Sequence, residues 1–262
     1  MNVFPQLLTG AVCQTNIVRT VIRRLNRRRA LDGFPVVALD PWFRRRQWKI
    51  ALTEVTTAEK DRLEALFRAV EGRRREFLFL DPLDNLFCWS SDMTRPSWAC
   101  GAGATLGGGV SDPWGGTTAA QLTTVTDGAG ISQSVDAPPN MIYNLSAWLR
   151  SDEDCNVDLY TSGGGQTVSQ RFATGATWRR VSLSIRLTAA GTAIEAGLLL
   201  PAPGTIQLAG PQLEAQPCPS SYKATFGTSG VFPKARFDHD KLVMRTIGPG
   251  SYEAVVSLSA PY

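Results

Sequence analysis

Residues 46–82 read RQWKIALTEVTTAEKDRLEALFRAVEGRRREFLFLDP, and this stretch decides the fold of the two ends of the chain. Every second residue from Trp48 to Leu52 is apolar, which is typical of a half-buried β-strand over Arg46–Val55. The apolar run Glu76–Leu80 predicts a second strand, which a following proline ends. The segment between the two strands has a different periodicity.

That segment predicts an amphipathic helix. Thr56 and Glu59 have the spacing of a capping box, and Gly72 stands where a helix C′ residue is expected. Apolar residues recur at helical spacing at Leu63, Leu66, Phe67 and Val70. Two strands are too few to bury this stripe, so further strands must come from elsewhere in the chain.

The C-terminal residues supply the missing strands. Short β-prone runs on both sides of Asp238–Asp240 predict a hairpin, and apolar residues alternate again over Tyr252–Leu258. A sheet built from both ends of the chain gives the helix a surface to cover. We therefore predict a small, discontinuous, mainly β (α+β) domain with one helix, formed by residues 1–84 and 227–262.

Charge separates the ends from the middle. Residues 1–84 carry 16 Lys and Arg against 10 Asp and Glu, and residues 227–262 carry 4 against 3. Residues 85–226 carry 7 against 10. Two charge regimes indicate two surfaces with different partners, so the middle is predicted to be an inserted domain.

The inserted residues predict an antiparallel β-sandwich of the jelly-roll kind. Short β-prone runs are separated by Gly, Pro, Asp and Ser, which is the spacing of such folds. The runs are Ile131–Val135, Ile142–Leu149, Val157–Tyr160, Thr177–Ile185, Ala193–Leu200 and Thr205–Leu208.

Composition argues against several kinds of site. The five cysteines form no CxxC pair and His239 is the only histidine, so we expect buried thiols, no metal site and no cofactor. The chain has one histidine and no G-x-S-x-G motif, so the sequence gives no support to a Ser-His-Asp triad. We therefore expect the protein to have no enzymatic activity. A net charge of +4 is small for a nucleic-acid-binding protein, so we expect no nucleic acid partner. No apolar run approaches the roughly 20 residues of a membrane span, so we expect no membrane insertion.

The strand, helix and strand of residues 46–82 resemble the distal tail and minor tail proteins of long-tailed phages (siphophages). In that family a tryptophan-bearing strand leads to a helix with a Leu-x-x-Leu-Phe core, then to a glycine, a Phe-rich strand and a proline-containing loop. The resemblance also covers the C-terminal strands over Ala235–Met244 and Tyr252–Leu258. It implies a homo-oligomeric, hexameric ring at the tail tip of a virion, assembled in the host cytoplasm and bound to tail tube and tail-tip hub proteins.

Residues 85–226 resemble the carbohydrate-binding modules of phage tail proteins. The features that carry this resemblance are the opening Asn85-Leu-Phe, Trp98, and the closing signature Ala209–Ala215 followed by Ser221-Tyr222. The chain departs from the usual pattern at Pro217–Pro219. The resemblance implies a module that binds a host cell-surface glycan.

Five residues of the module are predicted to bind carbohydrate. Sugar sites stack a C–H face on an exposed aromatic ring, while polar groups fix the hydroxyls. Trp89, Trp114 and Tyr160 lie beside turns and near polar residues that include Asp112 and Asp158.

Other residues of the module have simpler structural explanations. We expect Trp148 and Trp178 to be core residues because they lie on β-prone runs, and Trp98 to serve packing. Asp152–Asp154 offers oxygen ligands for calcium, but a solvated turn is the simpler interpretation.

Arginine clusters in the N-terminal part of the chain predict an oligomer interface, because Arg forks pair with carboxylates of neighbouring subunits. The predicted interface residues are Arg44, Arg45, Arg46, Arg73, Arg74 and Arg75. The sequence thus predicts a non-enzymatic tail-tip protein with a glycan-binding module. The alternative is a free lectin-like or glycan-degrading secreted protein, in which the ends serve only as a scaffold.

Overall fold

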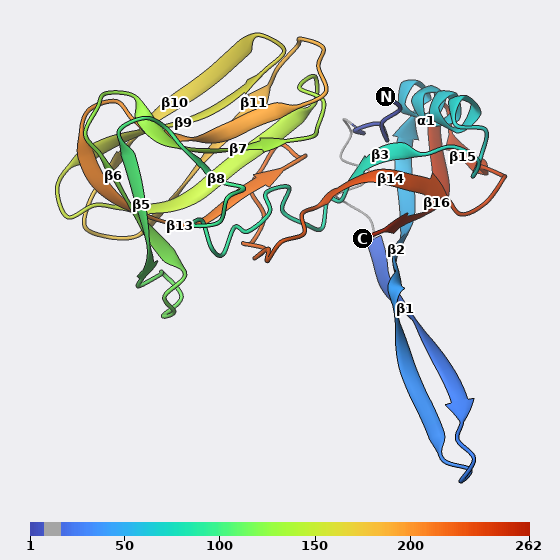
Figure 1. Ribbon diagram of the computed structural model, residues 1–262. Coiled ribbons are helices and arrows are strands. Elements are labelled where there is room, and N and C mark those ends of the chain that lie inside the picture. Colours follow the sequence, from blue (N-terminus) through green and yellow to red (C-terminus); the bar gives the residue numbers. More distant parts are fainter. Residues whose placement is uncertain (8–16) are drawn as a thin grey trace. The chain divides into compact units, whose positions relative to one another are not determined.

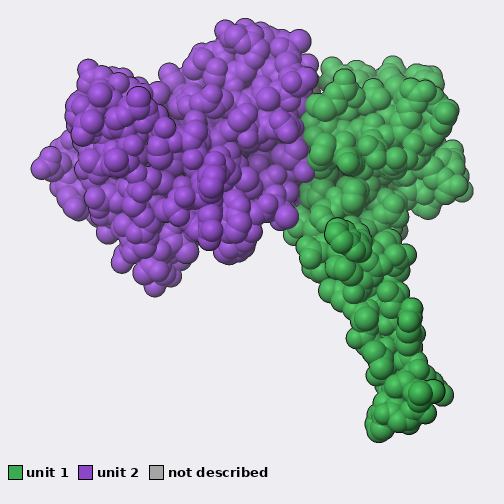
Figure 2. Space-filling model, in the orientation of Figure 1, with its two compact units in different colours: residues 1–79, 232–262 green, residues 80–231 purple. Residues whose placement is uncertain are grey.

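The chain folds into two compact units in the computed structural model, which describes residues 1–7 and 17–262. Unit 1 combines Met1–Phe79 with Phe232–Tyr262, and unit 2 is Leu80–Val231 (Figure 2). The two ends of the polypeptide therefore belong to one unit, and the middle of the chain forms the other.

The borders of the units differ from those expected from the sequence, which were placed after Asp84 and after Phe226. In the structure, unit 2 is five residues longer at each end, from Leu80 to Val231, so it includes both segments that connect the two units. The amide of Asp81 donates to the carbonyl of Gly230, and the amide of Gly230 donates to the carbonyl of Asn85. Because these bonds pair the two connecting segments with each other, both segments fold with unit 2.

Unit 1 is a six-stranded sheet with a helix on one side (Figure 1). The strand order is β1-β2-β16-β14-β3, and β15 pairs with β16. The strands are β1 (Ile17–Arg29), β2 (Pro35–Thr56), β3 (Phe77–Leu80), β14 (Val231–Phe237), β15 (Met244–Gly248) and β16 (Ser251–Pro261). The central pair, β2 and β16, joins the two ends of the chain, with Ile50 opposite Val256.

The helix α1 (Thr57–Ala69) begins as the sequence predicts. The side chain of Thr56 accepts from the Glu59 amide at 3.3 Å, and the Glu59 carboxylate accepts from the Thr56 amide at 3.0 Å. The end of the helix differs by one residue, because Glu71 (φ +56°) takes the left-handed C′ position expected for Gly72. Gly72 continues the left-handed turn at φ +66°.

The predicted apolar stripe is the buried face of α1. Its fully or nearly buried members are Leu63, Leu66 and Val70. The Phe67 ring lies 5.1 Å from the Phe237 ring, and Trp48 contacts Phe79 and Phe232 at centroid distances of 5.0 and 4.7 Å. Each fully buried side chain of this size contributes about 1.5–3 kcal/mol. The core of unit 1 therefore depends on residues from both ends of the chain.

The hairpin expected around Asp238–Asp240 is wrong. β14 and β15 both pair with β16, with Phe237 opposite Leu258 and Met244 opposite Ala254. β16 spans 11 residues, so its edge accommodates two shorter strands one after the other.

A two-stranded arm, Arg23–Arg44, extends beyond the sheet, and the sequence pattern does not predict it (Figure 1, blue). A ribbon of two strands buries little apolar surface. Its exposed apolar side chains are Leu25, Leu31, Phe34, Val36, Val37, Leu39 and Trp42.

Unit 2 consists of two five-stranded antiparallel sheets, β10-β9-β12-β7-β4 and β11-β8-β13-β6-β5. The strands are β4 (Ala99–Cys100), β5 (Ala104–Val110), β6 (Ala119–Thr124), β7 (Ala129–Val135), β8 (Ile142–Arg150), β9 (Cys155–Gly163), β10 (Gln166–Thr174), β11 (Arg179–Arg186), β12 (Ile194–Leu200) and β13 (Gly204–Glu214). Alternate residues of the strands form the buried core. The predicted fold class, a mainly β discontinuous domain with one helix and an inserted antiparallel sandwich, is confirmed.

The expectation of buried cysteines is wrong for those that the structure describes. Cys88 and Cys155 are half-buried, and Cys100 and Cys218 are exposed. Cys13 lies outside the described residues. Across residues 1–7 and 17–262, no helix combines the length and apolarity needed to span a bilayer.

Candidate functional site

The structure divides the five predicted carbohydrate-binding residues among three places. Trp89 lies in the segment between β3 and β4. Asp112 and Trp114 lie in the loop between β5 and β6, and Asp158 and Tyr160 lie on β9. The five residues therefore do not form one site.

Trp89 is half-buried against its neighbours. The Arg95 guanidinium lies 4.6 Å from the centroid of its ring, and Gly227 packs so closely that an added Cβ would lie 2.9 Å from the ring. The indole of Trp98, which is 7% exposed, donates to the Trp89 carbonyl at 3.0 Å. Trp98 thus has the packing role that the sequence predicts.

On the outer face of the β10-β9-β12-β7-β4 sheet, which we call the β9 face, the polar groups are paired with one another. Asp158 accepts two hydrogen bonds from Arg171, at 2.8 and 2.9 Å, and the Tyr160 hydroxyl donates to Glu195 at 2.7 Å. Burial, together with the Glu195 carboxylate, raises the pKa of Tyr160 to about 12. These four side chains therefore satisfy each other without a ligand.

Asp112 anchors the loop that carries Trp114. Its Oδ1 accepts from the amides of Trp114 and Gly116 at 2.9 and 2.8 Å, and its Oδ2 accepts from the amide and hydroxyl of Thr118 at 3.0 and 2.7 Å. Burial acts to raise the pKa of Asp112, but these hydrogen bonds outweigh it and lower the pKa to about 2. Asp112 is thus committed to the loop and is not a free acceptor.

The loop holds Trp114 against two other aromatic rings. Trp114 stacks on Tyr222 with a centroid distance of 4.8 Å and an interplanar angle of 9°, and its edge meets Trp148 at 6.1 Å. Gly210 (φ +54°) lies beneath the stack, where an added Cβ would lie 2.7 Å from Trp114. Trp114 nevertheless remains 48% exposed. It is a fixed aromatic surface open to solvent.

Trp148 and Trp178 extend this aromatic surface along the outside of the β11-β8-β13-β6-β5 sheet. Trp148 and Arg150 are alternate residues of β8, and both are half-buried. The Arg150 guanidinium lies 5.1 Å from the Trp178 ring centroid, and its Nε donates to the side chain of Gln207. We call these four residues and Trp114 the tryptophan face.

The expectation that Trp148 and Trp178 belong to the core is wrong. Ala147 and Leu149, each 1% exposed, are the residues of β8 that face the core, so the alternation turns Trp148 outward. This signal was present in the sequence, because the small and aliphatic residues on either side of Trp148 define the inward positions.

A polar pocket of about 360 Å³ adjoins the tryptophan face at Gln207. Gln121 of β6 also lines it, together with the exposed carboxylates of Asp152–Asp154. Within residues 1–7 and 17–262, no group of three or more His, Cys, Asp or Glu side chains is placed to hold a metal ion. With its two glutamines and three acidic side chains, the pocket offers amide donors and carboxylate acceptors of hydrogen bonds.

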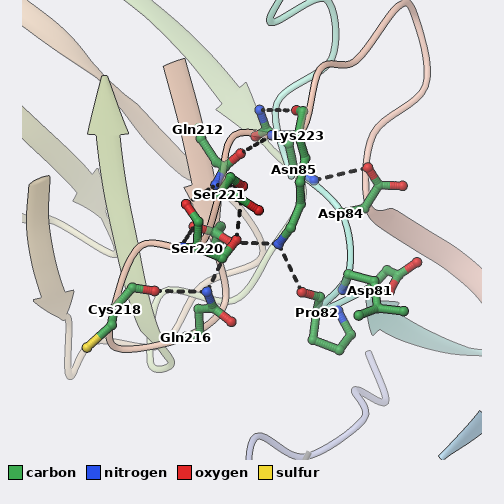
Figure 3. Close-up of polar contacts among 12 residues, drawn as sticks. Asp81, Pro82, Asp84, Asn85, Gln212, Gln216, Cys218, Ser220, Ser221 and Lys223 are labelled. Atoms are coloured by element: carbon green, nitrogen blue, oxygen red, sulfur yellow. Dashed lines mark hydrogen bonds and ion pairs between the residues drawn. The ribbon is translucent and has the colours of Figure 1, made fainter. Parts of the chain in front are cut away.

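The closing signature of unit 2 contributes to a cluster of hydrogen bonds on the same sheet (Figure 3). We call this cluster, which consists of Glu214, Ser220 and Lys223, the clasp. The Glu214 side chain, 2% exposed, accepts from Lys223 Nζ at 2.7 Å and from the Ser220 amide at 3.0 Å. Lys223 Nζ also donates to the Pro82 carbonyl at 3.2 Å. Burial acts to raise the pKa of Glu214, but the hydrogen bonds from Lys223 and Ser220 outweigh it and lower the pKa.

The clasp and the tryptophan face occupy the two ends of one sheet surface. β13 and β8 pair Glu214 with Asn144 at the clasp and Ala209 with Trp148 at the tryptophan face. The clasp fixes Ser220–Lys223, the segment that carries Tyr222, and Tyr222 supports Trp114. The position of the most exposed ring of the tryptophan face thus depends on the clasp.

The predicted interface arginines of unit 1 differ in their surroundings. Arg46 lies 5.3 Å from the Phe232 ring and 4.8 Å from the Tyr262 ring, so it packs within unit 1. The three predicted arginines that follow α1 form ion pairs. Arg73 pairs with Asp240, and Arg74 and Arg75 both pair with Glu71. Arg44 and Arg45 are exposed and have no ion pair among the described residues.

Comparison with known proteins finds similar folds but no sequence family. No family model and no curated protein matches the chain. A solved xylan-binding domain, CBM22-1 of Paenibacillus barcinonensis Xyn10C, covers 55% of the chain and 98% of its own length, with 14% identity and a TM-score of 0.43. TmCBM61 in complex with β-1,4-galactotriose covers 50% of this chain and 99% of its own, with 16% identity and a TM-score of 0.38. The enzymatically active domain of tailspike protein 4 from bacteriophage CBA120 covers 53% of this chain and 22% of its own, with 17% identity and a TM-score of 0.39.

Proposed function

We propose that unit 2 is a glycan-binding module and that its ligand lies on the tryptophan face. The observation that carries this proposal is the row of three indole rings, Trp114, Trp148 and Trp178, beside a pocket of amides and carboxylates. Proteins bind sugars by placing an aromatic ring against the C–H face and polar groups against the hydroxyls. The tryptophan face offers both kinds of group on one surface.

Trp114 makes the largest contribution in this proposal. Its ring is fixed by Tyr222 on one side and by the Asp112 loop, yet it is 48% exposed. A ring that is already ordered loses little conformational entropy when a ligand binds. A sugar stacked on Trp114 therefore gains apolar contact at low cost.

Arg150, Gln207 and Gln121 supply the polar part of the site. Arg150 and Gln207 are hydrogen-bonded to each other, which fixes the guanidinium beside Trp178. Gln207 and Gln121 line the pocket, where their amides can donate to and accept from sugar hydroxyls. A short oligosaccharide that stacks on the indoles thus reaches the pocket with its hydroxyls.

The proposal is tested by glycan binding with matched variants. The whole chain is applied to an array of bacterial surface glycans, and the affinity for the best ligand is measured by calorimetry. We expect Trp114→Ala and Trp178→Ala to weaken binding tenfold or more, which corresponds to about 1.4 kcal/mol. The control Tyr160→Phe, on the β9 face, should bind as the unchanged chain does. Normal binding by both tryptophan variants, with loss in Tyr160→Phe, would place the ligand on the other face.

We also propose that the chain is a structural component of a phage tail tip. The resemblance of residues 46–82 and of the C-terminal strands to distal tail proteins supports this role. The exposed apolar side chains and unpaired strand edges of the arm support a subunit that acts in an assembly. In this proposal unit 1 forms a hexameric ring at the end of the tail tube and contacts hub proteins. Six glycan-binding modules then act together, so weak sugar contacts add up to firm attachment.

Mass measurement and co-purification test the tail-tip role. We expect oligomers of the chain alone, or its recovery in particles when it is produced with the tail proteins of its own gene cluster. A chain that stays monomeric and never enters particles would favour the free lectin. Release of reducing sugar from bacterial polysaccharide would favour the glycan-degrading alternative.

A further inference from the structure

One side of the unit 1 sheet carries a surface of unusual composition. The core and α1 lie on the side of Trp48 and Ile50. The opposite side presents the alternate residues of β2 and β16, where the register sets Lys49 beside Ser257 and Ala51 beside Val255. We call this side the open face, because Lys49 and Val255 are exposed on it.

Two hollows mark the open face. A groove of about 650 Å³ lies between β2, β16 and the segment His239–Arg245, and Lys49 and Lys241 line it. A second hollow of about 320 Å³ lies at the base of the arm, lined by Arg45 and Lys234. The two hollows follow each other along the same strands, because Lys49 and Arg45 are both outward residues of β2.

Positive charge dominates both hollows. Their basic residues are Arg44, Arg45, Lys49, Lys234, Arg236, Lys241 and Arg245. Their two carboxylates are already engaged, Glu76 with Arg236 and Glu253 with Arg245, each at 3.0 Å. The five remaining basic residues have no ion pair among residues 1–7 and 17–262. The open face is thus suited to carboxylates or other anions.

Aliphatic side chains lie between the charges in the groove. Val243 is 60% exposed and Val255 is 53% exposed, and Ala51 lies beside Val255. The one aromatic ring in the lining of the groove is the His239 imidazole, whereas Trp42 and Phe43 line the second hollow. The groove therefore combines cations with aliphatic surface.

We propose that the open face binds an acidic segment of a partner protein, in which carboxylates alternate with aliphatic side chains. The carboxylates pair with Lys49, Lys241 and Lys234, and the aliphatic side chains pack on Val243 and Val255. Charge complementarity of this kind speeds association and fixes the register of the partner. This inference does not depend on glycan binding by unit 2.

Other occupants fit the groove less well. Single-stranded nucleic acid needs a series of aromatic rings on which successive bases stack, and the lining of the groove has a single imidazole, His239, among aliphatic residues. The arm of a second copy is itself basic, because residues 23–44 carry six Arg against two Asp, and it would be repelled. A protein segment with carboxylates meets both requirements of the groove.

The proposal is tested with synthetic peptides and the whole chain. Fluorescence anisotropy measures binding of a labelled ten-residue peptide of alternating Glu and Val. A Glu/Ser peptide of the same charge and a ten-nucleotide oligothymidine serve as comparison probes. We expect the Glu/Val peptide to bind at least fivefold more tightly than either probe. Equal or tighter binding of the oligothymidine would overturn the proposal in favour of a nucleic acid surface, and absence of peptide binding at moderate salt would overturn it outright.

Charge reversal locates the site. The double variant Lys49→Glu/Lys241→Glu should weaken peptide binding at least tenfold, and Val255→Ser should weaken it several-fold. Arg62→Glu/Arg68→Glu, the same double charge reversal on the exposed side of α1, should alter it less than twofold. If the double variant does not fold, as judged by circular dichroism, Lys49→Gln/Lys241→Gln replaces it with the same expected direction.

Two results would assign the binding elsewhere. Loss of peptide binding in Arg27→Glu/Arg28→Glu on the arm, with none in the open-face variants, would move the site to the arm. Loss of self-association in Lys49→Glu/Lys241→Glu, without any peptide binding in the unchanged chain, would show that a second copy occupies the face. Either result overturns the proposal, and neither bears on the glycan test, which uses only residues of unit 2.

Discussion

The two outer faces of the unit 2 sandwich are built by the same strand alternation, yet they use their polar groups differently. On the β9 face, Asp158 pairs with Arg171 and Tyr160 donates to Glu195. On the tryptophan face, indole rings remain partly exposed beside a polar pocket. A face whose groups satisfy each other gains little from a ligand, whereas the second face has aromatic surface and hydrogen-bonding groups to offer.

The two faces also differ in what lies behind them. Two buried carboxylates hold the rings of the tryptophan face in place: Asp112 bonds the loop that carries Trp114, and Glu214 bonds the segment that carries Tyr222. The carboxylates of the β9 face lie nearer to solvent, as the exposed Glu195 shows. Buried, fully bonded carboxylates fix their surroundings because an unpaired buried charge is costly. The comparison therefore predicts that substitutions under the tryptophan face have the larger effects.

The largest effect is expected from Glu214→Ala. This substitution leaves Lys223, whose side chain is 20% exposed, without its carboxylate. Breaking a buried ion pair from one side costs about 3–5 kcal/mol, and the partial exposure of Lys223 favours the lower end. Denaturant unfolding of unit 2 measures the loss. The control Glu195→Ala, on the β9 face, should cost about 0.5 kcal/mol or less; equal losses would remove the energetic difference between the faces.

A smaller, pH-dependent effect is expected from Asp112→Asn. The pKa of Asp112 is about 2 in the folded chain, below the value of about 3.9 for an unfolded chain. Its stabilisation is therefore complete above about pH 5 and is lost as the pH falls through 4 toward 2, and it amounts to about 2 kcal/mol. Urea unfolding between pH 2 and 7 should show a deficit in the variant that shrinks as the pH falls. A deficit that stays constant with pH would show that Asp112 acts through packing alone.

The sequence predicts much of the fold because local signals agree with tertiary packing. The capping box at Thr56 and the stripe through Leu63 depend on neighbours in the chain, and both lie where the periodicity places them. The arm escaped prediction because its arginines interrupt the apolar alternation of β1. The hairpin at Asp238–Asp240 was wrong because the choice of β16 as a common partner is made by tertiary packing.

The candidate site was only partly predictable. Trp114 and Tyr160 both lie beside a turn in the sequence. The sequence does not show which of the two rings is already engaged by another residue of the chain. Tyr160 is hydrogen-bonded to Glu195, 35 residues away, and Trp114 stacks on Tyr222, more than 100 residues away. These long-range contacts decide which ring is available. Trp148, in contrast, was predictable from the inward residues on either side of it.

A third effect, intermediate in size, is expected from Gly210→Ala. A non-glycine residue at φ +54° costs about 1–2 kcal/mol, and the new Cβ would lie 2.7 Å from Trp114. We expect the ring to shift and glycan affinity to fall between threefold and tenfold. The matched control is Gly165→Ala in the turn between β9 and β10, where φ is +79° and no atom lies within 4 Å. Gly165→Ala causes similar backbone strain but displaces no ring. If it also lowers the glycan affinity, the loss in Gly210→Ala comes from reduced stability and not from movement of Trp114.

The smallest effect is expected from Arg171→Ala on the β9 face. The Arg171 side chain is 59% exposed, and solvent screens its pairing with Asp158. We expect the unfolding midpoint to change little and the glycan affinity to stay within twofold of the unchanged chain, as measured by calorimetry at low and moderate salt. The reason is that Arg171 and Asp158 satisfy each other and contact no ring of the tryptophan face. If Arg171→Ala instead weakens glycan binding as strongly as Trp114→Ala, the pairing on the β9 face is one that a ligand replaces, and the roles of the two faces are reversed.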